Sequence, residues 1–95
     1  MTAYLIVDIE VTDPDAYQGY VTQVPPLVAR HGGTYLVRGG PHETLEGDWQ
    51  PHRMVVLQFP DATAARAFMD DPDYAPVKAI RHRASNSKMV LVEGA

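Results

Sequence analysis

Residues 32–40 read Gly-Gly-Thr-Tyr-Leu-Val-Arg-Gly-Gly, and residues 53–59 read Arg-Met-Val-Val-Leu-Gln-Phe. Both runs are rich in aromatic, β-branched and long apolar residues, and both are bounded by the Gly and Pro residues that commonly end strands. They predict the two antiparallel strands of a β-hairpin. Arg38 ends the first strand and Arg53 starts the second, so antiparallel pairing would bring both cations to the end of the hairpin beside its loop.

The segment before the hairpin predicts a strand with one apolar face and one mixed face. Residues 3–11 alternate between the two faces. The apolar face carries Leu5, Val7, Ile9 and Val11, and the mixed face carries Tyr4, Ile6, Asp8 and Glu10. A face that is half apolar and half acidic suits neither open solvent nor a dry interior. It indicates the lining of a cavity or a surface that meets a partner.

A helix follows this strand. Asp13 can cap its free N–H groups, and Pro14 fits the first helical position, where no N–H is needed. The apolar stripe of this helix stays in phase across Pro25 and Pro26. This predicts one kinked but continuous helix, with a break at Val24 as the alternative because residues before proline resist the α conformation.

Two helices and one strand are predicted after the hairpin. Asp61 caps the first of these helices, and Asp71-Pro72 starts the second, which carries Arg81 at its margin. Ser85-Asn86-Ser87 is a turn-forming cluster, and residues 88–93 form the last strand.

The order strand, helix, strand, strand, helix pair, strand predicts an α+β ferredoxin-like βαββαβ domain over residues 1–95. Its four strands form an antiparallel sheet, and the right-handed crossover rule places the helices on one face. The other face stays bare and carries the mixed side of residues 3–11. Large exposed apolar patches are uncommon on monomers, so we expect a homodimer through this open sheet face.

Composition excludes several classes of function. Twelve acidic residues outnumber eight Lys and Arg, for a net charge of −4, which argues against nucleic-acid binding. The chain has no cysteine, so thiolate metal sites and cysteine nucleophiles are unavailable. Apolar runs are too short to span a membrane, and no leader-like segment opens the chain, so a cytoplasmic protein is expected. A late basic cluster is interpreted as favourable charge at a helix C-terminus; it contains Lys78, Arg81, His82, Arg83 and Lys88.

Several motifs together resemble the DUF1330 family. They include Arg-Gly-Gly at residues 38–40, Glu-Gly-Asp-Trp at residues 46–49, and Arg53, and the resemblance extends over nearly the whole chain. It implies a dimeric α/β barrel, in which two ferredoxin-like sheets pack together, and a family without an assigned biochemical function. Neighbouring families of that superfamily include cofactor-free quinol monooxygenases, haem-degrading monooxygenases and muconolactone isomerases, but a shared fold does not transmit a reaction.

The two hairpin arginines are the first candidate site residues. Their planar guanidinium groups suit a carboxylate, and they would repel each other without an anion between them. A ligand carboxylate or phosphate is one partner for Arg38 and Arg53. Acids of the intervening loop, Glu43, Glu46 or Asp48, are the alternative partner. Residues 39–52 form a long connection, and such loops are often lids, so we expect this loop to close over the site.

The remaining candidates lie in or near that loop. His42 and His52 are the candidate catalytic residues, because histidine titrates near neutrality. Their spacing gives little support to a metal site, and we predict neither a metal nor an organic cofactor. Trp49 and Tyr17 are expected to line the pocket. The predicted ligand-binding set is therefore Arg38, Arg53, Trp49, Tyr17 and Glu46.

Two classes of function remain open from the sequence. The first is an enzyme that transforms a small anionic, partly apolar molecule by acid–base, monooxygenase-like or isomerase-like chemistry. The second is a non-catalytic ligand-binding or stress-associated homodimer that uses the same cavity. A poised acid–base group inside the cavity would favour the enzyme, whereas histidines far from it would favour binding.

Overall fold

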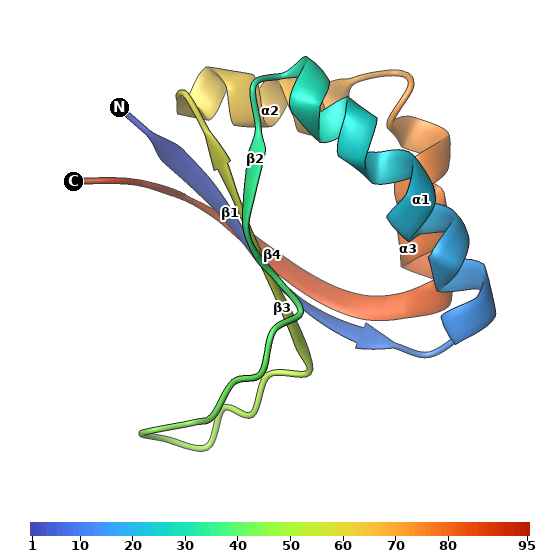
Figure 1. The fold of residues 1–95 in the computed structure, drawn as a ribbon, viewed down its shortest axis with the longest axis vertical. Coiled ribbons are helices and arrows are strands. Elements are labelled where there is room, and N and C mark those ends of the chain that lie inside the picture. The colour runs from blue at the N-terminus through green and yellow to red at the C-terminus, as the bar shows by residue number, and fades with distance from the viewer.

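Four strands and three helices form the structure, in the order β1-α1-β2-β3-α2-α3-β4 (Figure 1). The computed structural model describes residues 1–95. The elements are β1 (Ala3–Val11), α1 (Pro14–Arg30), β2 (Thr34–Arg38), β3 (Arg53–Phe59), α2 (Ala62–Asp70), α3 (Ala75–Ala84) and β4 (Ser85–Glu93). None of the helices is long and apolar enough to cross a membrane.

The strands form one antiparallel sheet in the order β2-β3-β1-β4, and the helices cover one of its faces (Figure 1). We call the helix-covered side the inner face and the other side the outer face. This arrangement confirms the predicted α+β ferredoxin-like fold. The sheet of a single chain is open, so closure into a barrel would need the sheet of a second copy.

The alternation of β1 matches its two faces. Leu5, Val7 and Ile9 are buried against the helices, whereas the residues between them are only partly buried on the outer face. The buried side chains of β1 and β3 face those of α1, α2 and α3, and together they form one apolar core. Burial of this face is the main driving force that holds the sheet to the helices.

Helix α1 runs through both of its internal prolines without a break. Asp13 caps it by accepting a hydrogen bond from the backbone N–H of Ala16 over 3.2 Å. Val24 is helical and buried in the core, so the alternative of a break at this residue is wrong. Packing of the apolar stripe overrides the local preference against helix before proline. Because Pro25 has no N–H, the carbonyl of Val21 has no i+4 partner.

The helix predicted to start at Asp71-Pro72 begins instead at Ala75. The carboxylate of Asp71 is occupied elsewhere: it accepts from the N–H of Asp73 and lies 3.0 Å from Arg30 and 2.8 Å from His31. Asp71 therefore ties the turn before α3 to the end of α1 rather than capping a helix.

Two predictions about the end of α3 are also wrong. Ser85-Asn86-Ser87 is not a turn, since α3 passes directly into β4 and these residues pair with residues 9–11 of β1. Arg81 does not lie at the helix margin, since only 4% of it is exposed. Pairing with the long strand β1 outweighs the turn preference of Ser and Asn, and it draws the last turn of α3 onto the sheet.

Candidate functional site

A β-bulge determines where Arg38 points. Tyr35 pairs with Leu57 and Arg38 pairs with Val55, so β2 uses one residue more than β3 over this span. The extra residue places Tyr35 and Arg38 on the same face of the sheet, although strict alternation would separate them. Arg53 lies on that face too, two residues from Val55. The arginines therefore converge as predicted, but diagonally rather than as a directly opposed pair.

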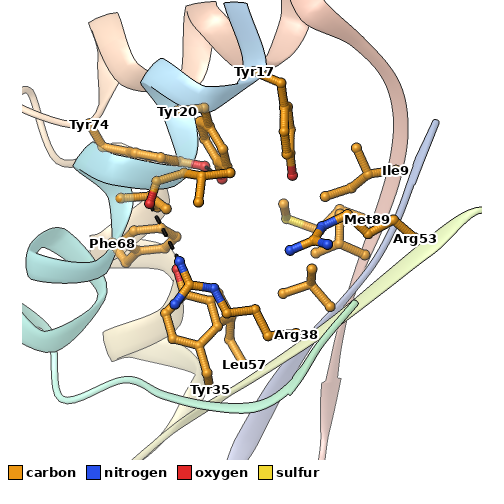
Figure 2. A pocket seen from close by; sticks show the side chains of 14 residues that line it. Ile9, Tyr17, Tyr20, Tyr35, Arg38, Arg53, Leu57, Phe68, Tyr74 and Met89 are labelled. Carbon is orange, nitrogen blue, oxygen red and sulfur yellow. Dashed lines mark hydrogen bonds between the residues drawn. The ribbon is translucent and has the colours of Figure 1, made fainter. Parts of the chain in front are cut away.

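Both arginines point into a cavity between the inner face and the helices, which we call the inner cavity (Figure 2). Of the fourteen residues that line it, only Arg38 and Arg53 are charged. The walls include Tyr17 and Tyr20 from α1, Phe68 from α2 and a methionine from β4. The enclosed volume is about 30 Å³, which corresponds to roughly one or two water molecules.

Arg38 links β2 to α1 across this cavity. Its Nη2 donates a long hydrogen bond of 3.4 Å to the carbonyl of Val21, the group that Pro25 leaves free (Figure 2). Its guanidinium carbon also lies 4.6 Å from the centre of the Tyr35 ring, a cation–π distance. Arg38 is otherwise exposed. It is thus held by weak contacts at the border of the cavity.

Arg53 is less exposed than Arg38 and packs closely against Gly39. The guanidinium lies against Gly39, where a Cβ atom would overlap it, and the φ of Gly39 is +71°. Glycine is therefore required at this position both for backbone conformation and for space. The Nε of Arg53 is buried and has no hydrogen-bond partner, which is an uncompensated polar atom in an apolar cavity.

No carboxylate lies within ion-pair distance of either arginine. All ion pairs of the chain involve Arg30, His31 or His52. The loop acids proposed as alternative partners, Glu43, Glu46 and Asp48, are exposed. The sequence suggested two kinds of partner for the arginines, a loop carboxylate or a ligand anion. No loop carboxylate pairs with either arginine in the structure.

Two phenols of the cavity, those of Tyr20 and Tyr35, are hydrogen-bond donors rather than bases. The hydroxyls of Tyr20 and Tyr74 lie 3.0 Å apart. Burial raises the pKa of Tyr20 far above its ordinary value, and the neighbouring Tyr74 adds to this. Burial also raises the pKa of Tyr35, although Arg38 opposes the effect. The hydroxyls of Tyr20 and Tyr35 therefore keep their protons at neutral pH. The hydroxyl of Tyr17 points into the same space as Arg53 (Figure 2).

The hairpin loop does not close over the inner cavity, contrary to our prediction. Residues 39–52 extend away from the helices (Figure 1). Asp8 on the outer face holds the part of this loop that precedes β3. Its carboxylate accepts hydrogen bonds from Trp49 Nε1 at 3.2 Å and from the His52 N–H at 2.9 Å. Burial raises the pKa of Asp8, but these bonds outweigh it, so the pKa is lowered overall.

The predicted site residues are therefore divided by the sheet. Arg38, Arg53 and Tyr17 line the inner cavity, whereas Trp49 packs on the outer face beside Ile6 and Val90. The sequence could not predict this division, because a long polar loop has no hydrophobic periodicity that indicates which face of the sheet it will cover.

Both candidate histidines also lie outside the inner cavity. His42 Nε2 is 2.7 Å from the carbonyl oxygen of Pro51 within the loop. The ring of His52 lies between two carboxylates of β1, 3.8 Å from Asp8 and 3.4 Å from Glu10. No group of three or more His, Asp and Glu side chains is arranged to hold a metal.

Five further cavity residues were not among the site residues predicted from the sequence: Tyr20, Tyr35, Phe68, Tyr74 and Met89. All five line the inner cavity. Their periodic positions mark them as inward-facing, but periodicity does not distinguish a packed core from a cavity wall. The one available signal was chemical: four tyrosines and two arginines facing inward exceed what a dry core accommodates.

The fold and the inner cavity define a ferredoxin-like α+β protein with a pocket between the sheet and its helices. Within that class, the chain belongs to the DUF1330 family: the model described as "Domain of unknown function (DUF1330)" matches residues 2–95. No curated protein matches the chain significantly.

Solved structures share this fold at low sequence identity. A protein of unknown function from Rhodopseudomonas palustris is 18% identical, with a TM-score of 0.79 over 99% of this chain and 82% of that one. A dimeric ferredoxin-like protein of unknown function from Jannaschia sp. CCS1 is 17% identical, with a TM-score of 0.76 over 99% and 100%. SnoaB, a cofactor-independent oxygenase from Streptomyces nogalater, is 16% identical, with a TM-score of 0.65 over 99% and 93%.

Proposed function

We propose that this protein binds a small, partly apolar molecule that carries a negative charge, and that the inner cavity is its site. The observation that carries the proposal is the pair Arg38 and Arg53, which face an apolar cavity without a carboxylate partner. The buried Nε of Arg53 lacks an acceptor, which is unfavourable, and an anion that enters would provide one and would also compensate the charge of the exposed Arg38.

The cavity chemistry specifies the shape of the ligand. Arg53 Nε is a buried donor without a partner, so a ligand oxygen that reaches it gains a charge-assisted hydrogen bond. Tyr17, Tyr35 and Phe68 supply aromatic walls, which favour a flat apolar body. An aromatic or unsaturated carboxylate has both parts.

Entry requires the cavity to enlarge, because its present volume is about 30 Å³ and small-molecule pockets enclose roughly 300–1,000 Å³. Arg38 is the side chain best suited to move, since it is exposed and holds α1 by one long hydrogen bond. A ligand carboxylate would replace the Val21 carbonyl as the acceptor for Arg38.

Catalysis in the cavity is the second candidate function. It is favoured by the fold shared with SnoaB, which is described as a cofactor-independent oxygenase, and by protonated phenols beside the proposed ligand site. The positions of His42 and His52 count against histidine as its base. Binding is therefore the function that the geometry supports best.

We also propose that two copies associate through the outer face. Apolar side chains remain exposed there: Val90 of β4 and Trp49 of the loop, which lie together on this face, are each 58% exposed. Related folds from Jannaschia sp. CCS1 and Thermobifida fusca are described as dimeric. Light scattering across micromolar dilution tests this, and a persistent mass of 10.5 kDa would contradict it.

Thermal-shift titration with benzoate, and with benzyl alcohol as the uncharged analogue, tests the binding function. Benzoate is expected to raise the Tm of the wild type but not that of Arg38→Ala or Arg53→Ala. Arg66→Ala, which removes an exposed arginine of α2, should keep the response. If neither benzoate nor longer aromatic carboxylates stabilise the wild type, the proposal fails. Oxygen uptake or product formation with a bound ligand would establish the catalytic candidate.

A further inference from the structure

A second cleft lies at the junction of α3 and β4, on the inner side of the edge strand. Its volume is about 410 Å³, it is open to solvent, and it is lined by five polar residues and two methionines: Arg81, His82, Ser85, Asn86, Ser87, Met69 and Met89. It uses neither of the arginines of the inner cavity. We call it the Arg81 cleft.

Arg81 is the unusual feature of this cleft. Only 4% of the residue is exposed, yet the guanidinium group cannot lose its charge. No carboxylate forms an ion pair with it. Buried arginines are normally paired, but this one has no carboxylate partner, and its guanidinium carbon lies 5.9 Å from the centre of the Tyr20 ring, at the outer limit of a cation–π contact.

The hydrogen bonds of Arg81 leave donors free. Nη1 donates to Ser87 Oγ, Nη2 lies 3.5 Å from His82 Nε2, and Nε has no partner. In the whole chain, only Arg53 and Arg81 have a buried side-chain atom without a hydrogen-bond partner. Because Ser87 Oγ accepts from Arg81, the hydrogen of its hydroxyl is free for another acceptor.

The surroundings of the guanidinium are electropositive. The pKa of His82 is lowered, first by burial and then by Arg81 and Lys78, whose charges disfavour a further proton. The carboxylate of Glu10 lies outside the cleft lining and accepts a hydrogen bond from Asn86 Nδ2 at 3.2 Å. It does not neutralise Arg81.

We infer that the Arg81 cleft binds a phosphate group, either free inorganic phosphate or the terminal phosphate of a small ester. Arg81 supplies the charge and the free Nε–H, and the Ser87 hydroxyl supplies a further donor in a different direction. A tetrahedral oxyanion accepts from several directions at once, whereas a planar carboxylate offers two oxygens in one plane. Phosphate binding would compensate the buried charge and give Arg81 Nε an acceptor.

The cleft is independent of the proposed functions. It lies on the opposite side of the sheet from the proposed dimer face. Only Met89 lines both this cleft and the inner cavity. The late basic cluster in the sequence was its only signal, and we had interpreted that cluster as charge at a helix end.

The test is a titration of the full-length protein with sodium phosphate, and separately with glycerol phosphate, against sodium chloride at matched ionic strength. Isothermal calorimetry gives the affinity, and ¹H–¹⁵N spectra locate the site. We expect saturable shifts at the amides of residues 81–87. Saturation by both compounds indicates a site for phosphate groups in general, and saturation by only one identifies the source.

Three variants make the result specific. Arg81→Lys keeps the charge but removes Nε, and Ser87→Ala removes one hydroxyl from an edge strand with little effect on packing. Each is expected to weaken phosphate binding by about tenfold or more. Arg83→Ala, at an exposed position of the same helix, should bind like the wild type.

The inference is overturned if phosphate shifts only residues near Arg38 and Arg53, if chloride produces the same shifts, or if Ser87→Ala and Arg81→Lys both bind like the wild type. Arg53→Ala separates this inference from the proposed function. It should abolish the benzoate response and leave phosphate binding unchanged, so that either proposal can fail alone.

Discussion

The indole Nε1 of Trp49 lies 3.2 Å from Asp8 Oδ2, a contact that ties the second half of the hairpin connection to β1, the strand next to β3 in the sheet. The same carboxylate accepts from the backbone N–H of His52. One side chain of β1 thus fixes both the indole and the backbone of a loop that has no regular structure of its own.

Removal of this carboxylate is expected to release the loop. Asp8→Ala leaves two donors without an acceptor, and a loss of about 1–3 kcal/mol in unfolding free energy follows. Fluorescence of Trp49, the only tryptophan, should shift to longer wavelength as the indole leaves the outer face. Asp70→Ala, which removes an exposed acid from α2, is the control. An unchanged spectrum in Asp8→Ala would contradict the anchoring role.

Acid should destabilise the protein through Asp71. Hydrogen bonds from His31, from the Asp73 N–H and from Arg30 lower the pKa of Asp71 from 3.8 to about 2. Because the pKa is lower in the folded state, the contribution is fully present above the unfolded value and is lost as pH falls through this window. Urea denaturation between pH 5 and pH 2 measures it. Asp71→Asn should flatten the profile relative to Asp70→Asn, and parallel profiles would contradict the prediction.

Alternation and turn chemistry were sufficient to predict the order of elements, the inner residues of β1 and the cap at Asp13. They could not predict the bulge in β2, because an extra residue in a strand leaves no regular pattern. They also misplaced Ser85-Asn86-Ser87, where pairing with β1 overrides local preference. The convergence of Arg38 and Arg53 was predictable from the hairpin. The absence of a protein carboxylate beside these arginines could not be predicted, because it depends on where the loop lies.

Two adjacent glycines give a matched test of the Arg53 site. Gly39 has a φ of +71° and lies against the guanidinium of Arg53, whereas a Cβ at Gly40 would meet nothing within 4 Å. Gly39→Ala should lower the unfolding free energy by about 1–2 kcal/mol from backbone conformation alone. It should also displace Arg53 and abolish the benzoate response. Gly40→Ala should keep both, and equal behaviour of the two variants would refute this role for Gly39.

The prolines of α1 allow a test of Arg38 at a distance. Pro25→Ala restores the N–H that bonds to the Val21 carbonyl, and Pro26→Ala restores the one that bonds to the Thr22 carbonyl. Each proline disfavours a helix interior by up to about 3 kcal/mol, so both variants should be at least as stable as the wild type.

Only Pro25→Ala competes with Arg38 for its acceptor, the Val21 carbonyl. It should release Arg38 from α1, open the border of the inner cavity and accelerate benzoate association in stopped-flow measurements. Equal association rates for Pro25→Ala and Pro26→Ala would show that the contact between Arg38 and Val21 does not control access to the cavity.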